Sequence, residues 1–219
     1  MTPIATTAEE LRAGRAGGPP PPSDGGQGGG RGGDGGDLPH TVPLRAYYLG
    51  LSLGLISILM FFMALTSAYL VRKGTGGDWQ SLPVPDILWI NTAVLVLSSI
   101  TVERARKLLA ANSQEGFRLW WGVTTLLGLM FLAGQFAAWQ QLRAAGVFLS
   151  TNPASSFFYL LSGAHGVHVV GGVLALMVVF ARRSYRRVTQ AAAAEMASIY
   201  WHFMDLLWVF LLLLLFLGR

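Results

Sequence analysis

The chain of 219 residues contains no cysteine. This absence excludes disulfide bonds, thiolate metal sites and cysteine nucleophiles. The sequence also lacks a nucleophile elbow, a phosphate-binding glycine loop and a metalloprotease helix. The common signatures of hydrolases and of nucleotide-binding enzymes are therefore missing.

Charged residues are scarce as well. They make up only 12% of the chain, while 53% of the residues are hydrophobic and the mean hydropathy is +0.48, whereas soluble domains are about 25% charged. A helix needs roughly 20 mainly apolar residues to cross a bilayer core of about 30 Å. Five stretches meet this requirement, approximately residues 47–71, 87–108, 117–142, 155–181 and 196–217. The sequence therefore predicts an all-α integral membrane protein, a bundle of five transmembrane helices.

The basic residues indicate how these spans are oriented. Twelve of them precede the first span or lie where the second span leads into the third and the fourth into the fifth, namely Arg12, Arg15, Arg31, Arg45, Arg104, Arg106, Lys107, Arg118, Arg182, Arg183, Arg186 and Arg187. Four lie on the opposite side, namely Arg72, Lys73, Arg143 and Arg219. The positive-inside rule then predicts a cytoplasmic N-terminus and a periplasmic or extracellular C-terminus. Because the cations flank spans and form no single patch, we expect no nucleic-acid partner despite the net charge of +5.

The N-terminal part has a different composition. Residues 14–36, GRAGGPPPPSDGGQGGGRGGDGG, are rich in glycine and contain four consecutive prolines. Such a segment has too few apolar residues to offset the loss of chain entropy on folding. We predict a disordered cytoplasmic tail over residues 1–40, either a simple tether or a docking arm, followed by a membrane domain over residues 41–219.

Polar residues inside the last two spans are the candidate functional residues. His165 and His168 are three residues apart, as are His202 and Asp205, so each pair shares one helix face. His168 and Asp205 lie near the midpoints of antiparallel spans joined by a short loop. Because an intramembrane carboxylate is costly and normally pairs inside the bundle, we predict that Asp205 hydrogen-bonds to a histidine of the fourth span, His168 in preference to His165.

Other interpretations of these residues are weaker. Imidazole binds zinc, iron, copper and haem, but a carboxylate-bridged di-iron site would need several glutamates that the spans lack, so we expect no metal and no cofactor on this chain. A proton pathway would need titratable groups reaching both surfaces. Glu103, near the cytoplasmic edge, is predicted to pair with Arg106 or Lys107 one turn later.

The fourth span also contains several glycines, and the loop before it carries signals for a helix boundary. Its four glycines allow a close approach by another backbone or by a lipid chain, and both interpretations stay open for Gly163, Gly166, Gly171 and Gly172. In the preceding outer loop, Asn152 and Pro153 are typical of a helix stop. Ser155 is predicted to cap the N-terminus of the span.

Two segments carry a family resemblance. SSFFYLLSGAHGVHVVGG followed by YWHFMDLLWVFLLLLLFL resembles the last two helices of the third subunit of haem-copper oxidases, the cytochrome c oxidase subunit III family. WINTAVLVLSSITVERA is similar to that family's Asn-Thr and Ser-Ser helix, and FFMALTSAYL to the end of its preceding helix. The resemblance runs from about residue 45 to the C-terminus. Its motif positions are His165, His168, Trp201, His202 and Asp205.

The resemblance implies a five-helix bacterial form in the cytoplasmic membrane. Such a chain has no catalytic residue and no redox centre, because haem and copper reside in subunits I and II. It packs directly beside subunit I, binds structural phospholipid and supports proton uptake by its neighbour. The motif residues would then form an interhelical polar cluster or contact lipid. One departure concerns Ile58, which stands where many members carry a glutamate.

Two alternatives differ from a cytochrome c oxidase subunit. The first is the related accessory subunit of a quinol oxidase or nitric oxide reductase system, which shares the fold. The second is an independent transporter or membrane enzyme built on the polar cluster. The second would need a continuous polar route that the sequence does not contain.

Overall fold

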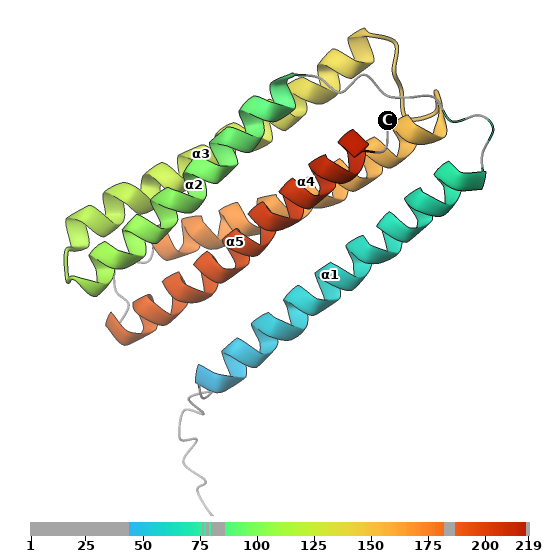
Figure 1. The fold of residues 1–219 in the computed structure, drawn as a ribbon. Coiled ribbons are helices and arrows are strands. Elements are labelled where there is room, and N and C mark those ends of the chain that lie inside the picture. Colours follow the sequence, from blue (N-terminus) through green and yellow to red (C-terminus); the bar gives the residue numbers. More distant parts are fainter. Residues whose placement is uncertain (1–43, 76, 78, 80–85, 182–186, 218–219) are drawn as a thin grey trace, which may run out of the picture. The chain divides into compact units, whose positions relative to one another are not determined.

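The computed structural model describes residues 44–75, 77, 79, 86–181 and 187–217. The predicted disordered tail, residues 1–40, lies outside this part of the chain. The described residues form five helices and no strand (Figure 1), namely α1 Leu44–Thr75, α2 Ile87–Ala110, α3 Gln114–Ala144, α4 Pro153–Ala181 and α5 Arg187–Leu217. All five are long and apolar enough to cross a membrane. The predicted all-α bundle of five candidate transmembrane helices is therefore confirmed.

Most of the helices continue beyond the apolar spans. The shortest, α2, has 24 residues, which corresponds to about 36 Å and already exceeds a bilayer core of about 30 Å. The largest difference is at the start of α5, which begins nine residues before the predicted span at Met196. Residues 191–194 are four consecutive alanines, the strongest helix formers. Helix propensity therefore extends α5 past the point where the apolar run starts.

The start of α4 corrects a prediction. Asn152, not Ser155, caps this helix: the backbone N–H of Ser155 donates to Asn152 Oδ1 over 2.8 Å, and the N–H of Asn152 donates to Ser155 Oγ over 3.2 Å. This reciprocal pair satisfies two N–H groups that a helix start leaves unpaired. Pro153 is the first helical residue, where its fixed φ suits a helix and its missing N–H costs nothing. The Asn-Pro pair begins α4 and stops no helix.

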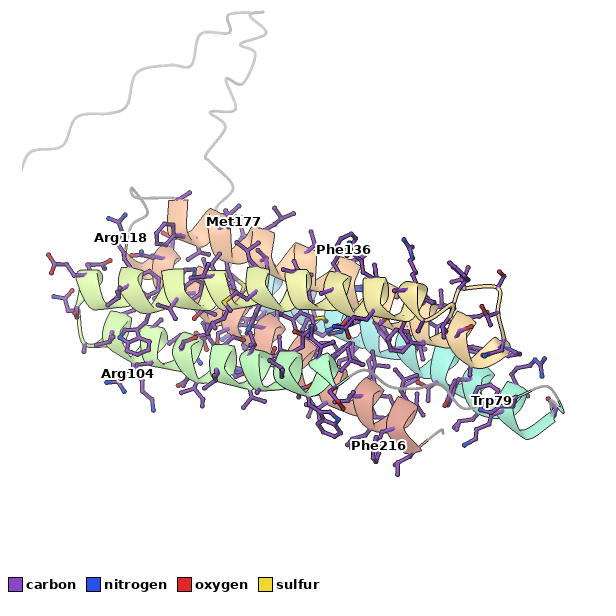
Figure 2. The ribbon with its side chains drawn as sticks, turned by 90° about the horizontal axis from the view of Figure 1, so that it is seen from above. Trp79, Arg104, Arg118, Phe136, Met177 and Phe216 are labelled. Carbon is purple, nitrogen blue, oxygen red and sulfur yellow. The ribbon has the colours of Figure 1, made fainter. Side chains whose placement is uncertain are left out.

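Four helices form a ring. α2 packs against α3, α3 against α4, α4 against α5, and α5 against α2. α1 contacts only α4 and α5 among the described elements, and Figure 1 shows it beside α5 on the outside of the ring. Figure 2 shows Arg104 and Arg118 at one end of this bundle and Trp79 and Phe216 at the other. In the predicted orientation, the arginine end is cytoplasmic.

Buried tryptophans connect the ring. The indole N–H of Trp121 in α3 donates to the Leu176 carbonyl of α4 over 2.9 Å. From α5, Trp208 donates to Thr92 Oγ1 of α2 over 3.1 Å. A buried indole N–H needs an acceptor, because leaving it unpaired in an apolar medium costs free energy. These bonds therefore favour one arrangement of the helices over rotated alternatives.

Candidate functional site

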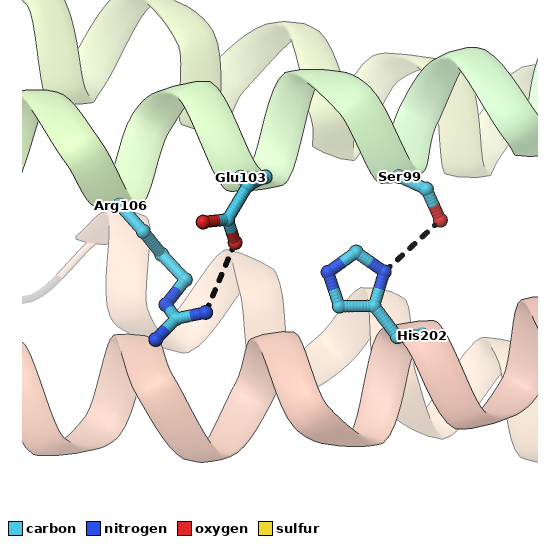
Figure 3. A network of polar contacts seen from close by, with 4 residues as sticks. All are labelled: Ser99, Glu103, Arg106 and His202. Atoms are coloured by element: carbon cyan, nitrogen blue, oxygen red, sulfur yellow. Dashed lines mark hydrogen bonds and ion pairs between the residues drawn. The ribbon is translucent and has the colours of Figure 1, made fainter.

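The polar residues of α5 meet α2 along a line that we call the polar seam, defined by Ser98, Ser99, Trp201, His202 and Asp205. The Trp201 indole donates to Ser98 Oγ over 2.8 Å. Ser99 Oγ donates to Asp205 Oδ2, and His202 Nδ1 lies 3.2 Å from Ser99 Oγ, as Figure 3 shows. Trp201 and His202 lie one turn before Asp205 on the same face of α5, so this polar face of α5 meets the adjacent Ser98 and Ser99 of α2.

The proton arrangement in the seam follows from donor counting. A serine hydroxyl has one proton to donate, and the Ser99 hydroxyl donates it to Asp205 Oδ2. The contact with His202 then requires Nδ1 to carry a proton and donate to Ser99 Oγ. A neutral His202 is therefore unprotonated at Nε2, which forms no hydrogen bond with the described residues.

The predicted hydrogen bond between Asp205 and His168 is wrong. Asp205 faces α2, whereas His168 Nδ1 lies 2.7 Å from the Ala164 carbonyl one turn earlier on its own helix. The His168 ring packs against Phe61 and Phe62 of α1, with centroid distances of 6.4 and 5.7 Å. Equal depth along the membrane does not make two side chains partners, because the direction in which each side chain leaves its helix decides what it contacts.

His165, the second predicted partner, lies in the core of the ring. It is fully buried, and neither ring nitrogen has a hydrogen-bond partner among the described residues. Its ring packs against Phe131 of α3 and Trp208 of α5, with centroids 5.9 and 5.0 Å away. The five predicted site residues are thus divided: Trp201, His202 and Asp205 join the seam, His165 fills the core, and His168 faces α1.

Sequence reasoning missed the serines on α2. Ser98 and Ser99 belong to the segment that resembles the family's Ser-Ser helix, but adjacent serines in an apolar span carry no pairing information by themselves. Both accept or donate hydrogen bonds across the helix interface. In the same region, the predicted pairing of Glu103 is confirmed, since Arg106 Nη1 lies 3.0 Å from Glu103 Oε2 (Figure 3).

A hydrogen bond that sequence reasoning also missed joins α1 to α5. The Tyr48 hydroxyl donates to Glu195 Oε2 over 2.8 Å. Tyr48 and Glu195 are 147 positions apart in the chain, so no local sequence pattern could reveal this pair. The bond attaches α1 near its N-terminal end, while His168 packs against α1 further along.

The four glycines of α4 behave differently from one another. A Cβ at Gly172 would lie 3.0 Å from the Tyr200 ring and 3.2 Å from the Trp201 ring, so α5 approaches closely there. At Gly163 and Gly171 the nearest atoms would lie 3.7 and 3.8 Å away, which is ordinary contact. At Gly166 no atom lies within 4 Å. Close packing against described residues is therefore confined to Gly172.

A groove opens beside the polar seam. Its volume is about 500 Å³, and its lining residues are Val96, Ser99, Ile100, Glu103, Arg104, Lys107 and His202. Apart from His202, all of these belong to α2. The groove therefore joins the membrane-embedded histidine to the cationic end of α2.

The described residues contain no group of three or more histidine, aspartate or glutamate side chains placed to hold a metal ion. The seam brings together one carboxylate, one imidazole, one indole and two hydroxyls, and each contact is a hydrogen bond between helices. Its chemistry is thus suited to joining α2 and α5.

Comparison with known proteins decides the family. The sequence matches the family described as cytochrome c oxidase subunit III over residues 38–218. The chain belongs to this family. Its membership confirms the resemblance, and it implies a complex with other oxidase subunits. Together with the five spanning helices, it describes a multi-pass membrane protein.

Bacterial relatives cover most of the chain. A probable cytochrome c oxidase subunit 3 of Nocardia farcinica is 36% identical over 166 residues, which are 73% of this chain and 82% of the relative. The cytochrome c oxidase subunit 3 of Synechocystis is 32% identical over 176 residues, 77% of this chain and 74% of the relative. A Mycobacterium tuberculosis relative is 34% identical over 171 residues, 75% of this chain and 84% of the relative.

Proposed function

We propose that this chain is a non-redox accessory subunit of a respiratory haem-copper oxidase with cytochrome c as electron donor. It stabilises the catalytic subunit I, binds phospholipid, and supports proton uptake by its neighbour during oxygen reduction. The observation that supports the proposal is the use of the intramembrane polar residues, since Trp201, His202 and Asp205 form hydrogen bonds that join α5 to α2. The names of the relatives, which are cytochrome c oxidase subunits, support cytochrome c as the donor.

The surface of α1 supports a place among lipids and a larger membrane partner. This helix contacts only α4 and α5 among the described elements. Leu49, Met60 and Val71, spread along its length, are each more than 60% exposed. Large apolar side chains are stable in such positions only against lipid or another apolar protein surface. We therefore expect subunit I to contact this chain within the membrane plane.

The cofactors and the location follow from the same proposal. Haem and copper reside in subunits I and II, and this chain holds structural phospholipid but no redox group. The complex resides in the bacterial cytoplasmic membrane, with the N-terminus of this chain in the cytoplasm and the C-terminus outside. Arg104 and Arg118 at a single end of the bundle support this orientation, as Figure 2 shows.

The test is purification of the complex through a tag at the N-terminus of this chain. We expect co-purified subunits I and II and a reduced-minus-oxidised spectrum with haem and copper bands, which should be absent when the chain is expressed alone. Oxidase prepared without this chain should keep its haem spectrum but lose sustained proton uptake during turnover. A chain that purifies alone, or that carries its own stoichiometric metal, would overturn the proposal.

A further inference from the structure

Two amide side chains point into the ring of four helices. Buried residues recur every three or four positions along α2 and α3, so they mark the face of each helix that is turned toward the others. On α2 this face includes Asn91 and Leu95, and on α3 it includes Phe131 and Gln135. Asn91 and Gln135 are only 4% and 3% exposed. Both amides are therefore enclosed by the bundle.

Asn91 and Gln135 lie at the same level of the ring. The Asn91 side chain lies directly against Gly134 of α3, where an added Cβ would overlap it. Gln135 is the next residue of α3 and belongs to the buried face. The close contact at Gly134 therefore brings the asparagine of α2 beside the start of the glutamine side chain.

A histidine of α4 reaches this level as well. The His165 ring packs against Phe131, which lies one turn from Gln135 on the same face of α3. It also packs against Trp208 of α5, whose indole N–H donates to Thr92, the residue after the asparagine in α2. Three polar side chains from three helices thus share one cross-section of the ring. We call them the polar layer, namely Asn91, Gln135 and His165.

The polar layer contains buried polar atoms that have no hydrogen-bond partner among the described residues. They are Asn91 Nδ2, both polar atoms of the Gln135 amide, and both ring nitrogens of His165. The amide nitrogens are donors, the glutamine oxygen is an acceptor, and a neutral imidazole has one donor and one acceptor. Buried side chains in native proteins are nearly always hydrogen-bonded, because an unpaired polar group in an apolar medium costs free energy. The layer therefore requires a ligand that both donates and accepts.

Enclosure and charge limit what this ligand is. His165 is fully buried and the two amides are nearly so, hence neither a lipid nor a side chain of a partner subunit reaches the unpaired atoms. The layer has no carboxylate to neutralise a cation, and the described part of the chain contains no cluster of three or more histidine, aspartate or glutamate side chains placed to hold a metal ion. Water is small and neutral, and it both donates and accepts hydrogen bonds.

We propose that the polar layer binds at least one ordered water molecule that bridges α2, α3 and α4. This water accepts from the amide N–H groups of Asn91 and Gln135 and donates to the acceptor nitrogen of His165. Buried waters typically make about three hydrogen bonds to groups that would otherwise stay unpaired. The proposal concerns the core of this chain, so it goes beyond the proposed function and does not depend on it.

A bridging water makes the rotations of three helices depend on one another. If α2, α3 or α4 turned about its own axis, the water would lose a partner and the remaining polar groups would stay buried and unpaired, which is unfavourable. The polar layer thus fixes the inward faces of α2, α3 and α4. The polar seam does the same for α2 and α5 at another level of the bundle.

The first test is a cryo-EM map of the assembly purified through the N-terminal tag, at a resolution that shows ordered waters inside membrane-embedded subunits. We expect density within about 3 Å of both the Gln135 amide and a ring nitrogen of His165. A layer in which these groups bond directly to each other, or in which no density lies between them, would overturn the proposal.

A substitution tests the sign of a change in stability. Gln135→Met keeps the length of the side chain and removes its polar atoms. In a hydrated layer the water loses partners, so the midpoint of thermal dissociation from the complex should fall by about 2–4 °C for each hydrogen bond lost. In a dry layer the same change removes unpaired polar atoms and should raise the midpoint.

Gln141→Met is the matched control, because Gln141 belongs to the same helix but is exposed. We expect its midpoint to stay close to that of the wild type. A higher midpoint for Gln135→Met, or an equal fall in both variants, would overturn the proposal. If Gln135→Met fails to assemble, the wild-type map decides the question, since it needs no substitution.

Discussion

At the scale of single residues, the Ser99 hydroxyl links α2 to two side chains of α5. It donates to Asp205 and accepts from His202, so one α2 oxygen serves two α5 side chains. The second carboxylate oxygen of Asp205 is buried without a hydrogen-bond partner among the described residues. Asp205 therefore depends on Ser99 more than a carboxylate with several donors would.

Removing the Ser99 hydroxyl should destabilise the chain, and removing Ser99 and Asp205 together should destabilise it less. Ser99→Ala should cost about 1–3 kcal/mol, because the buried Asp205 oxygen loses its donor. The double variant Ser99→Ala with Asp205→Leu should recover much of this loss, since apolar replacement of both partners is nearly neutral. The measurement is the thermal midpoint at which this chain dissociates from the purified complex.

The variant Asp205→Asn tests the same hydrogen bond, because the oxygen of the new side-chain amide can still accept from the Ser99 hydroxyl. We expect this variant to assemble into the complex nearly as well as the wild type. Ser57→Ala is the matched control, since Ser57 is exposed and donates only to the Leu53 carbonyl of its own helix. The interpretation of the seam fails if the Ser99 and Asp205 effects simply add, or if Ser57→Ala costs as much as Ser99→Ala.

At the scale of helices, one side chain of α5 reaches the other three members of the ring. Trp201 donates to Ser98 of α2. A Cβ at Gly128 of α3 would lie 2.6 Å from its ring, and a Cβ at Gly172 of α4 would lie 3.2 Å from it. The ring of Trp201 therefore fits where two facing helices have no side chain. Small residues allow such approaches where the driving force is packing.

Adding a methyl group at this contact should disturb the ring of helices. Gly128→Ala should destabilise the chain by about 1–3 kcal/mol, because an overpacked core must displace a side chain or a helix. Gly166→Ala is the control, since no atom lies within 4 Å of its Cβ position, and alanine favours the helix by up to about 1 kcal/mol over glycine. Thermal dissociation of the complex measures both, and equal midpoints would contradict the packing described.

At the scale of the whole molecule, the bundle has two chemically different ends and an outlying helix. Arg104 and Arg118 mark one end, as Figure 2 shows, and α1 stands outside the ring of the other four helices (Figure 1). α1 is held by its contacts with α4 and α5, including the bond from Tyr48 to Glu195. The described helices thus combine a bonded four-helix ring with a helix that presents most of its apolar surface outward.

The orientation of this bundle can be tested with reporter fusions. Alkaline phosphatase fused after Arg219 should be active, because the enzyme folds outside the cytoplasm, and green fluorescent protein fused before Met1 should fluoresce. Alkaline phosphatase inserted in the loop 111–113 should be inactive. The reverse pattern would contradict the orientation inferred from the basic residues.

The sequence by itself determined the number of spanning helices and their approximate limits. These properties depend on local composition, since roughly 20 apolar residues specify a span wherever they occur. The pairing of Glu103 with a cation one turn later, Arg106 or Lys107, was also predictable from the sequence, and the structure has Arg106 as the partner.

Only the tertiary structure decided which helix each polar side chain faces. His168 and Asp205 belong to adjacent antiparallel helices, yet one turns to α1 and the other to Ser99 of α2. That direction depends on how every helix is rotated about its own axis. The rotation is set by contacts between distant segments, such as Trp201 against Gly128, and no periodicity within a single helix contains that information.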